Sequence, residues 1–427
     1  MRLPTVLRTH PAVPALPLVG LLFSYIFLTS TRHIEQLVAM PWATQAASYA
    51  VHAPAPMAAA AAAGLTAVEA TRLKALGTWE LGAAIPTWRI ALQPVLITVA
   101  CLSIPTAGIM AASLWLVGAS PDLYTLQLLA IVVVLLTAHS VIGFVIGRRL
   151  HALYSAPLLA VAVFVGTSFP LGTDYYWAHH VTGSISWVGF GQAYSPAMTA
   201  AALLPTVCLS VACVALAGPR RLQARSAALA LVVTTGGLLG AYAITMDWRS
   251  MPPTSRGLAP VTCVGEEPEV CLPEAGAAHI DEVREGIKAM TGRLKAAGVL
   301  VREPERITDV TVAEKQRIDT TGDHWTLALA PDEADRALRE NIAISVVGMP
   351  CENPDWNTLH YPTLWVAEII GVRDNYLTWL SRETEGFSHG QSREQLLSET
   401  DRVNDLSSEE RKAWYRQQIR SACQAGH

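Results

Sequence analysis

Charged side chains are nearly absent from the first 246 residues of this chain and crowd the remainder. The first part holds 5 acidic and 11 basic residues, whereas the part from Asp247 onward holds 30 acidic and 20 basic residues. Apolar stretches that can cross a hydrocarbon core of about 30 Å fill the first part. We therefore expect an α-helical polytopic membrane domain, residues 1–246, and a water-soluble domain, residues 247–427, with a linker at 247–262.

Seven apolar stretches are predicted to be transmembrane helices: 14–30, 44–67, 91–117, 125–147, 154–171, 197–217 and 227–246. The second contains Pro54 and Pro56, followed by an alanine run that offers a smooth face for helix packing. No small-residue cleavage site follows the first stretch. We interpret it as the first helix and not as a signal peptide.

Basic residues predict the direction of these helices. With seven crossings, ten basic residues fall on one side: Arg2, Arg8, Arg72, Lys74, Arg89, Arg148, Arg149, Arg220, Arg221 and Arg225. The short loops of the other side carry Arg32 alone. Because cytoplasmic loops are rich in lysine and arginine, we expect a plasma-membrane protein with a cytoplasmic N-terminus and an extracytoplasmic C-terminal domain.

The cysteines agree with this direction. Three lie within apolar stretches, where a thiol behaves as a small apolar side chain: Cys101, Cys208 and Cys213. The other four are all in the soluble domain: Cys263, Cys271, Cys351 and Cys423. An even number in an extracytoplasmic domain indicates disulfides, and three pairings are open. We favour Cys263–Cys271, which closes a short loop, and this leaves Cys351–Cys423. Four unpaired buried thiols are the alternative.

The soluble domain is predicted to be mostly helical with a small sheet. Helical periodicity covers 276–297, 332–347, 362–380 and 408–422, and short strands are expected at 307–312 and 324–329. The last helix is preceded by Ser407 and carries Glu410, the pattern of a capping box. The aromatic residues between Trp356 and Trp379 are interpreted as core. An acidic domain without a basic stripe argues against nucleic acid as a partner.

The segment 172–196 is rich in glycine and aromatic residues, and we interpret it as an outer gate. Its proposed gate residues are Asp174, Tyr175, Tyr176, Trp177, His179, His180 and Trp187. A metal site at its histidines is disfavoured, because adjacent histidines on a helix point in different directions and no third ligand is evident. In the fourth stretch, we favour a neutral His139 bonded to a neighbouring helix over a functional site. Gly143 and Gly147 on that stretch form a possible packing face.

The stretch between the second and third apolar segments is basic and amphipathic. Leu73, Leu76, Trp79 and Leu81 recur at roughly helical intervals, and Pro86 ends the pattern. This pattern predicts a helix lying on the inner membrane surface. Its periodicity is compatible with a simple membrane anchor or with a docking element for a partner protein.

The motifs Arg72-Leu73-Lys74 and Trp79-Glu80-Leu81, followed by Pro86 and Arg89, resemble the cytoplasmic interfacial helix of actinobacterial ABC-2-type transporter permeases. The resemblance covers residues 1–246. The seventh span and the outer domain would be additions to a six-span core. The segment VTCVGEEPEVCLPEAGAAH is also similar to a cysteine loop that follows the last span of some such permeases.

The resemblance implies a permease subunit of an ABC exporter, working with a second permease chain, identical or related. A separate cytoplasmic ATPase would bind ATP and Mg²⁺, since this chain lacks a Gly-x-x-x-x-Gly-Lys-Ser/Thr loop. The chain is then not an enzyme and holds no cofactor or metal. The residues expected to contact the ATPase are Arg72, Lys74, Trp79, Glu80, Leu81 and Arg89. The alternatives are a membrane-anchored extracytoplasmic sensor or binding protein and, less favoured, an intramembrane enzyme.

Overall fold

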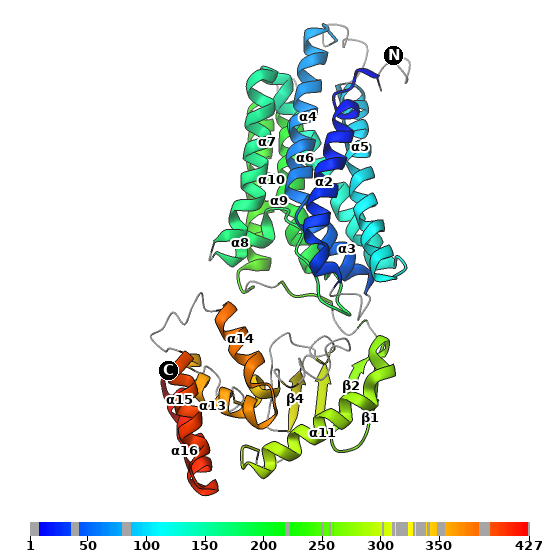
Figure 1. The fold of residues 1–427 in the computed structure, drawn as a ribbon. Helices are drawn as coiled ribbons and strands as arrows, with labels where there is room; N and C mark the ends of the chain where they lie inside the picture. Colours follow the sequence, from blue (N-terminus) through cyan, green and yellow to red (C-terminus); the bar gives the residue numbers. More distant parts are fainter. Residues whose placement is uncertain are drawn as a thin grey trace. The chain divides into compact units, whose positions relative to one another are not determined.

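In a computed structural model the chain divides into two compact units, Met1–Arg256 and Gly257–His427 (Figure 1). The division falls inside the predicted linker. The structure describes all residues except 1–7, 36–41, 79–86, 174, 218–222, 249–251, 256–257, 259, 301–302, 310–311, 313–322, 328, 330–338, 340–341, 348–354, 384–392 and 426–427.

The first unit is a bundle of helices. Its elements are α2 (Ala12–Glu35), α3 (Ala43–His52), α4 (Ala55–Ala75), α5 (Thr87–Val117), α6 (Leu123–Arg149), α7 (Ala152–Ser168), the short 3₁₀ helix η2 (Phe169–Gly172), α8 (Tyr176–Val181), α9 (Pro196–Leu216) and α10 (Gln223–Thr245).

Within the described residues, five of these helices are long and apolar enough to cross a membrane: α2, α5, α6, α9 and α10. Helices α3 and α4 pass the same test together but are bent by 55° at a short break, which brings the number to six if the pair is one span. Helix α7 supplies a shorter apolar helix over Leu153–Ser168. The chain is therefore a membrane protein. Each predicted stretch coincides with helix, and seven crossings remain a prediction.

The break between α3 and α4 follows from the prolines noted in the sequence. Pro54 lies just before α4. At a helix start its missing N–H costs nothing, but inside a helix a proline removes a backbone hydrogen bond, so α3 cannot continue through it. Beyond the break, the alanine-rich helix α4 packs closely on α6. A Cβ atom added at Gly143 would lie 2.1 Å from the carbonyl oxygen of Ala63, and one at Gly147 would lie 2.5 Å from Cα of Ala67. These two glycines are thus a packing face between α6 and α4.

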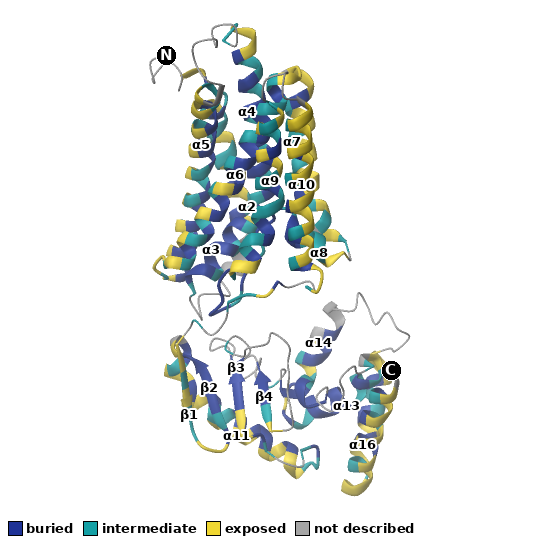
Figure 2. Cartoon of the chain, turned by 180° about the vertical axis from the view of Figure 1, so that it is seen from behind, coloured by how far each residue is buried: buried dark blue, intermediate teal, exposed yellow. Residues whose placement is uncertain are grey.

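The outside of the bundle carries many exposed large apolar side chains, among them Leu18, Trp115 and Leu231 (Figure 2). Such a surface is unfavourable in water and suits contact with lipid.

The second unit contains a small sheet and several helices. Its elements are β1 (Val261–Val264), β2 (Glu269–Pro273), the 3₁₀ helix η4 (Glu274–His279), α11 (Ile280–Ala296), β3 (Arg306–Asp309), β4 (His324–Leu327), α13 (Trp356–Ile369), α14 (Arg373–Glu383), α15 (Arg393–Asn404) and α16 (Ser408–Ala425). The strand order is β1-β2-β3-β4. Strand β1 pairs with β2 antiparallel, and the other two pairings are parallel.

One face of the sheet is apolar and belongs to the core of this unit. Val270, Ile307 and Trp325 occupy neighbouring register positions on the three parallel strands and are almost fully buried. The predicted periodicity of α11 places Ile287 and Leu294 in the same core. Strands β1 and β2 were not predicted from the sequence, because both are short and lie within the segment interpreted as a cysteine loop.

The helix predicted over 362–380 forms as two helices, α13 and α14. They are separated near Gly371, which has a φ of 83°. Glycine adopts this left-handed conformation without steric cost and often ends a helix in this way. The capping box before α16 is present in part, since Glu410 Oε2 accepts a hydrogen bond of 2.9 Å from the backbone N–H of Ser407. Trp365 and Tyr376 are buried in the core, as predicted, whereas His360 and Tyr361 of the same stretch are only partly buried.

Candidate functional site

A non-helical segment between α8 and α9 is buried inside the membrane unit. We call residues 182–195 the α8–α9 connection. Ile185, Val188, Phe190 and Tyr194 within it have at most 5% of their surface exposed. Buried backbone that forms no helix or sheet must satisfy its N–H and C=O groups in some other way.

Helix α3 and the residue before it bond three backbone groups of this connection. Trp42 Nε1 donates a hydrogen bond of 3.0 Å to the carbonyl of Gln192. Ser48 Oγ accepts one of 3.1 Å from the N–H of Val188. A ring nitrogen of His52 bonds the carbonyl of Ile185. Because Ser48 and His52 are four residues apart on one helix, they present one face to the connection.

The remaining bonds come from the connection itself and from α6. The hydroxyl of Tyr194 donates to the carbonyl of Ser186, and Gln192 Oε1 accepts from the N–H of Gly189 at 3.1 Å. Gln127 Nε2 on α6 donates to the carbonyl of Tyr194 at 3.2 Å. Trp187 packs on Tyr49 of α3 with ring centroids 5.3 Å apart. The connection is therefore fixed by side chains of α3 and α6.

The described residues proposed from the sequence as an outer gate do not all lie together, although Tyr176, His179 and His180 form consecutive ring contacts. Trp187 belongs to the connection, whereas Trp177 packs edge-on against Tyr242 of α10. Tyr175 is 70% exposed. Tyr176 packs on His179, and His180 packs on Trp248 beyond α10. Asp174 lies outside the described residues.

The residues that position the connection were missed by the sequence reasoning: Trp42, Ser48, His52, Gln192 and Tyr194. One signal could have found Ser48 and His52, because polar and aromatic side chains cluster in the ten residues before Pro54, in a stretch otherwise rich in alanine.

At the opposite end of α4 the structure shows a buried ion pair. Glu69 is 2% exposed and accepts two hydrogen bonds from Arg72, 2.8 Å from Nε and 2.6 Å from Nη2. Helix α4 ends at Ala75, and Gly77 has a φ of 67°. The helix predicted after Arg72 is therefore not continuous. Arg72 belongs to α4 and faces Glu69.

Of the other residues expected to contact the ATPase, Lys74 and Arg89 are exposed. Trp79, Glu80 and Leu81 lie outside the described residues. Intramembrane His139 is buried, and its Nδ1 contacts the carbonyl of Leu135 at 2.8 Å, a bond within its own helix and not to a neighbouring one as expected.

In the second unit the disulfide Cys263–Cys271 is present, as predicted. The two cysteines are direct partners in the β1–β2 register. Cys423 is also disulfide-bonded, and its predicted partner Cys351 lies outside the described residues.

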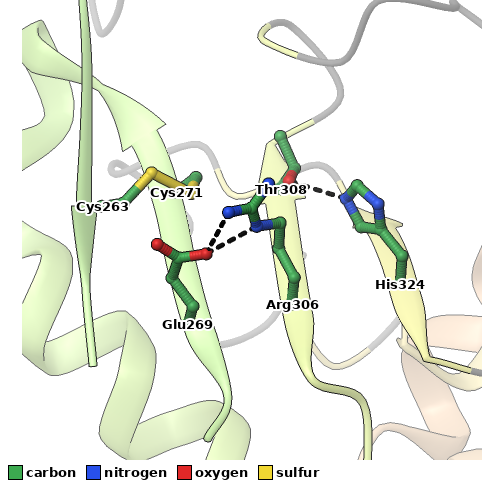
Figure 3. The surroundings of a disulfide bond; sticks show 6 residues. All are labelled: Cys263, Glu269, Cys271, Arg306, Thr308 and His324. Carbon is green, nitrogen blue, oxygen red and sulfur yellow. Dashed lines mark hydrogen bonds and ion pairs between the residues drawn. A yellow bond between two sulfur atoms is a disulfide. The ribbon is translucent and has the colours of Figure 1, made fainter. Parts of the chain in front are cut away.

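The disulfide shares one face of the sheet with several polar side chains (Figure 3). Glu269 on β2 accepts a hydrogen bond of 2.6 Å from Arg306 on β3, and Thr308 Oγ1 lies 2.9 Å from Nε2 of His324 on β4. Cys263, Glu269 and Cys271 form the one His/Cys/Asp/Glu group with metal-like spacing in the described chain. Since two of the three are joined in a disulfide, this arrangement suits structural bonding and not metal binding.

These features together define a polytopic helical membrane protein with a separate, disulfide-containing soluble domain. Residues 270–424 are similar to one family, described as a domain of unknown function (DUF7224). This match begins in β2 and ends in α16, so it lies within the second unit. No curated protein and no solved structure matches the chain.

Proposed function

We propose that this chain is the permease subunit of an ABC transporter that works as an exporter, driven by a separate cytoplasmic ATPase. The observation that carries the proposal is the broken span α3/α4 together with the buried α8–α9 connection that packs against α3. Both are irregular backbone inside an apolar bundle.

Irregular backbone is costly in a membrane and is tolerated where protein groups satisfy it or where it lines a polar path. Transporters use discontinuous helices of this kind to form the place where a substrate passes. A bundle that only anchors a soluble domain needs no such break. The hydrogen bonds that Trp42, Ser48, His52 and Gln127 form with the connection fit a closed gate, because they hold the connection in one defined conformation.

The ends of the helices support the expected direction. The start of α2, the end of α4, the start of α5, the end of α6, the start of α7, the end of α9 and the start of α10 lie at one end of the bundle (Figure 1). In the sequence, the predicted cytoplasmic basic residues lie in or next to these helix ends. Helix α7 runs between the two ends of the bundle, which favours seven crossings and an extracytoplasmic C-terminal domain.

In this proposal the ATPase contacts the segment between α4 and α5. Lys74 and Arg89 flank that segment in the sequence, and Trp79, Glu80 and Leu81 belong to it. The Glu69–Arg72 pair would stiffen the end of α4, so that movement of the ATPase is passed into the helix that packs on α6. A second permease chain would complete the transport path.

Co-purification tests this contact. The chain is isolated from its native membrane, and the ATPase that accompanies it is quantified by mass spectrometry and by ATP hydrolysis. We expect Lys74→Glu combined with Arg89→Glu to lower the yield of ATPase at least fivefold, because both charges that flank the α4–α5 segment are reversed. Arg225→Glu is the matched control, since Arg225 is an exposed basic residue at the start of α10, at the same end of the bundle. Retention of the ATPase by the double variant at the control level would overturn the contact.

The second candidate is an extracytoplasmic sensor or binding protein with a membrane anchor. The one family match, to a domain of unknown function, lies in the soluble domain alone and does not distinguish the two candidates. Under that proposal no ATPase co-purifies with the wild-type chain.

A further inference from the structure

The residues that follow α10 return to the α8–α9 connection before the chain reaches the soluble domain. We call residues 252–255 the strap. The backbone N–H of Ala193 donates to the carbonyl of Ser255, and the N–H of Ser255 donates to the carbonyl of Ala193, both at 2.9 Å. This exchange is an isolated antiparallel bridge.

A side chain adds a third bond. The hydroxyl of Ser195 donates to the carbonyl of Pro253 at 2.7 Å and accepts a bond of 3.1 Å from the N–H of Met198. Ser195 is the residue that caps the start of α9. One hydroxyl therefore ties together the strap, the end of the connection and the first turn of α9.

The approach to the strap is also held in place. Trp248 follows α10 and packs on His180 of α8 with ring centroids 5.2 Å apart. Tyr242 of α10 makes the corresponding contact with Trp177 at 5.2 Å. Helix α8 thus packs on Tyr242 and Trp248, and the connection that follows it bonds to the strap.

The sequence of the strap keeps this attachment small. Pro252 and Pro253 have no N–H, so the bridge at Ser255 cannot extend into a longer ladder through them. A single bridge and one hydroxyl bond fix the register and still allow release. The soluble unit begins at Gly257, two residues after Ser255.

We propose that the strap is a latch that holds the α8–α9 connection closed. The consequence for transport rests on the proposed permease function. The latch itself does not, because it is a property of the first unit.

Amide hydrogen exchange of the full chain in detergent micelles tests the latch. The N–H groups of Val188 and Gly189 bond to Ser48 and Gln192 and not to the strap, so they report on the connection itself. Ser255→Pro removes the donor of one bridge bond. We expect it to speed exchange over 184–190 about tenfold, with α6 and the soluble unit unchanged. Thr254→Pro, at the neighbouring position, is the control and should leave exchange within twofold of wild type.

An engineered disulfide that can be reduced provides a second test by hydrogen exchange. Partners that exchange both backbone bonds lie about 5.5 Å apart between Cα atoms, a distance that a disulfide spans. In Ala193→Cys/Ser255→Cys, the oxidised chain should exchange several-fold more slowly over 184–190 than the same chain after reduction. This comparison stands even if Ser255→Pro fails to fold.

Unchanged exchange over 184–190 in Ser255→Pro and between the oxidised and reduced double variant would overturn the latch. ATPase stimulation is measured on the same samples. If the lock slows exchange and leaves ATP hydrolysis unaffected, the latch stands and the permease proposal fails.

Discussion

At the scale of single residues, the most informative side chain is one that the sequence reasoning passed over. Glu69 is the buried acid that binds Arg72, a residue assigned from the sequence to an outside partner. A charge pattern shows which residues are basic, but it cannot show that one of them forms an ion pair with an acid three positions earlier on the same helix. Lys74 has no such acid three or four positions before it and is exposed.

Removing the acid tests this pair. Glu69→Ala leaves the guanidinium of Arg72 without its buried carboxylate partner, and we expect a loss of roughly 1–3 kcal/mol in the free energy of unfolding of the membrane unit. The loss is less than for a fully buried pair, because Arg72 is 31% exposed. Denaturation in mixed micelles measures it. Lys74→Ala, an exposed change on the same turn, should stay within about 0.5 kcal/mol of wild type. Equal effects of the two changes would argue against a structural pair.

A second residue-scale effect lies in the soluble unit. Burial lowers the pKa of His360, and the carboxylate of Asp355 opposes that shift. His360 Nδ1 is 2.9 Å from the hydroxyl of Tyr376. Because the folded pKa is depressed, the unfolded chain binds a proton first as the pH falls below about 6.5. The contribution of a neutral His360 to stability is therefore full above that pH and is lost as the pH falls toward the folded pKa.

His360→Asn should reduce this dependence. Between pH 7.5 and 5 we expect the urea midpoint of the soluble unit to fall less in the variant than in the wild-type chain. Pulse proteolysis of the full chain, read on the soluble unit, gives both midpoints. Parallel pH profiles for the two proteins would contradict the assignment.

At the scale of elements, hydropathy predicted the positions of the apolar helices well. It could not predict the α8–α9 connection, because that segment is held by Trp42, Ser48 and Gln127, residues far from it in the chain. Strands β1 and β2 could not be predicted for a similar reason, since each has few residues and gains its stability from pairing and from the disulfide. The glycine step on α6 was visible in the sequence, and the structure supplies its partner, α4.

Substitution by alanine should lower stability at Gly143 of α6 but not at Gly108 of α5. Gly143→Ala places Cβ against the carbonyl of Ala63, which is backbone and cannot move aside cheaply, so we expect a loss of about 1–3 kcal/mol. Gly108 on α5 has nothing within 4 Å of the same atom, and Gly108→Ala should be neutral or slightly stabilising. Denaturation in mixed micelles again measures both. A neutral Gly143→Ala would show that α4 and α6 do not pack this closely.

At the scale of the whole molecule, the chain joins two units that bury their apolar side chains in different ways. The membrane unit exposes large apolar residues, whereas the described part of the soluble unit keeps nearly all of its own inside, with Val261 as the exposed exception. The soluble unit carries the disulfides and the family match, and the membrane unit carries the broken span and the buried connection. We propose that substrate passes through the membrane unit.

The permease proposal requires that the basic end of the bundle faces the cytoplasm and that the soluble unit faces outward, since the ATPase contact depends on this topology. The most direct measurement fuses two reporters after His427 in turn, one that works only in the cytoplasm and one that works only outside it. The account predicts a silent cytoplasmic reporter and an active outer one. Activity of the cytoplasmic reporter, with silence of the other, would contradict the topology and the permease proposal together.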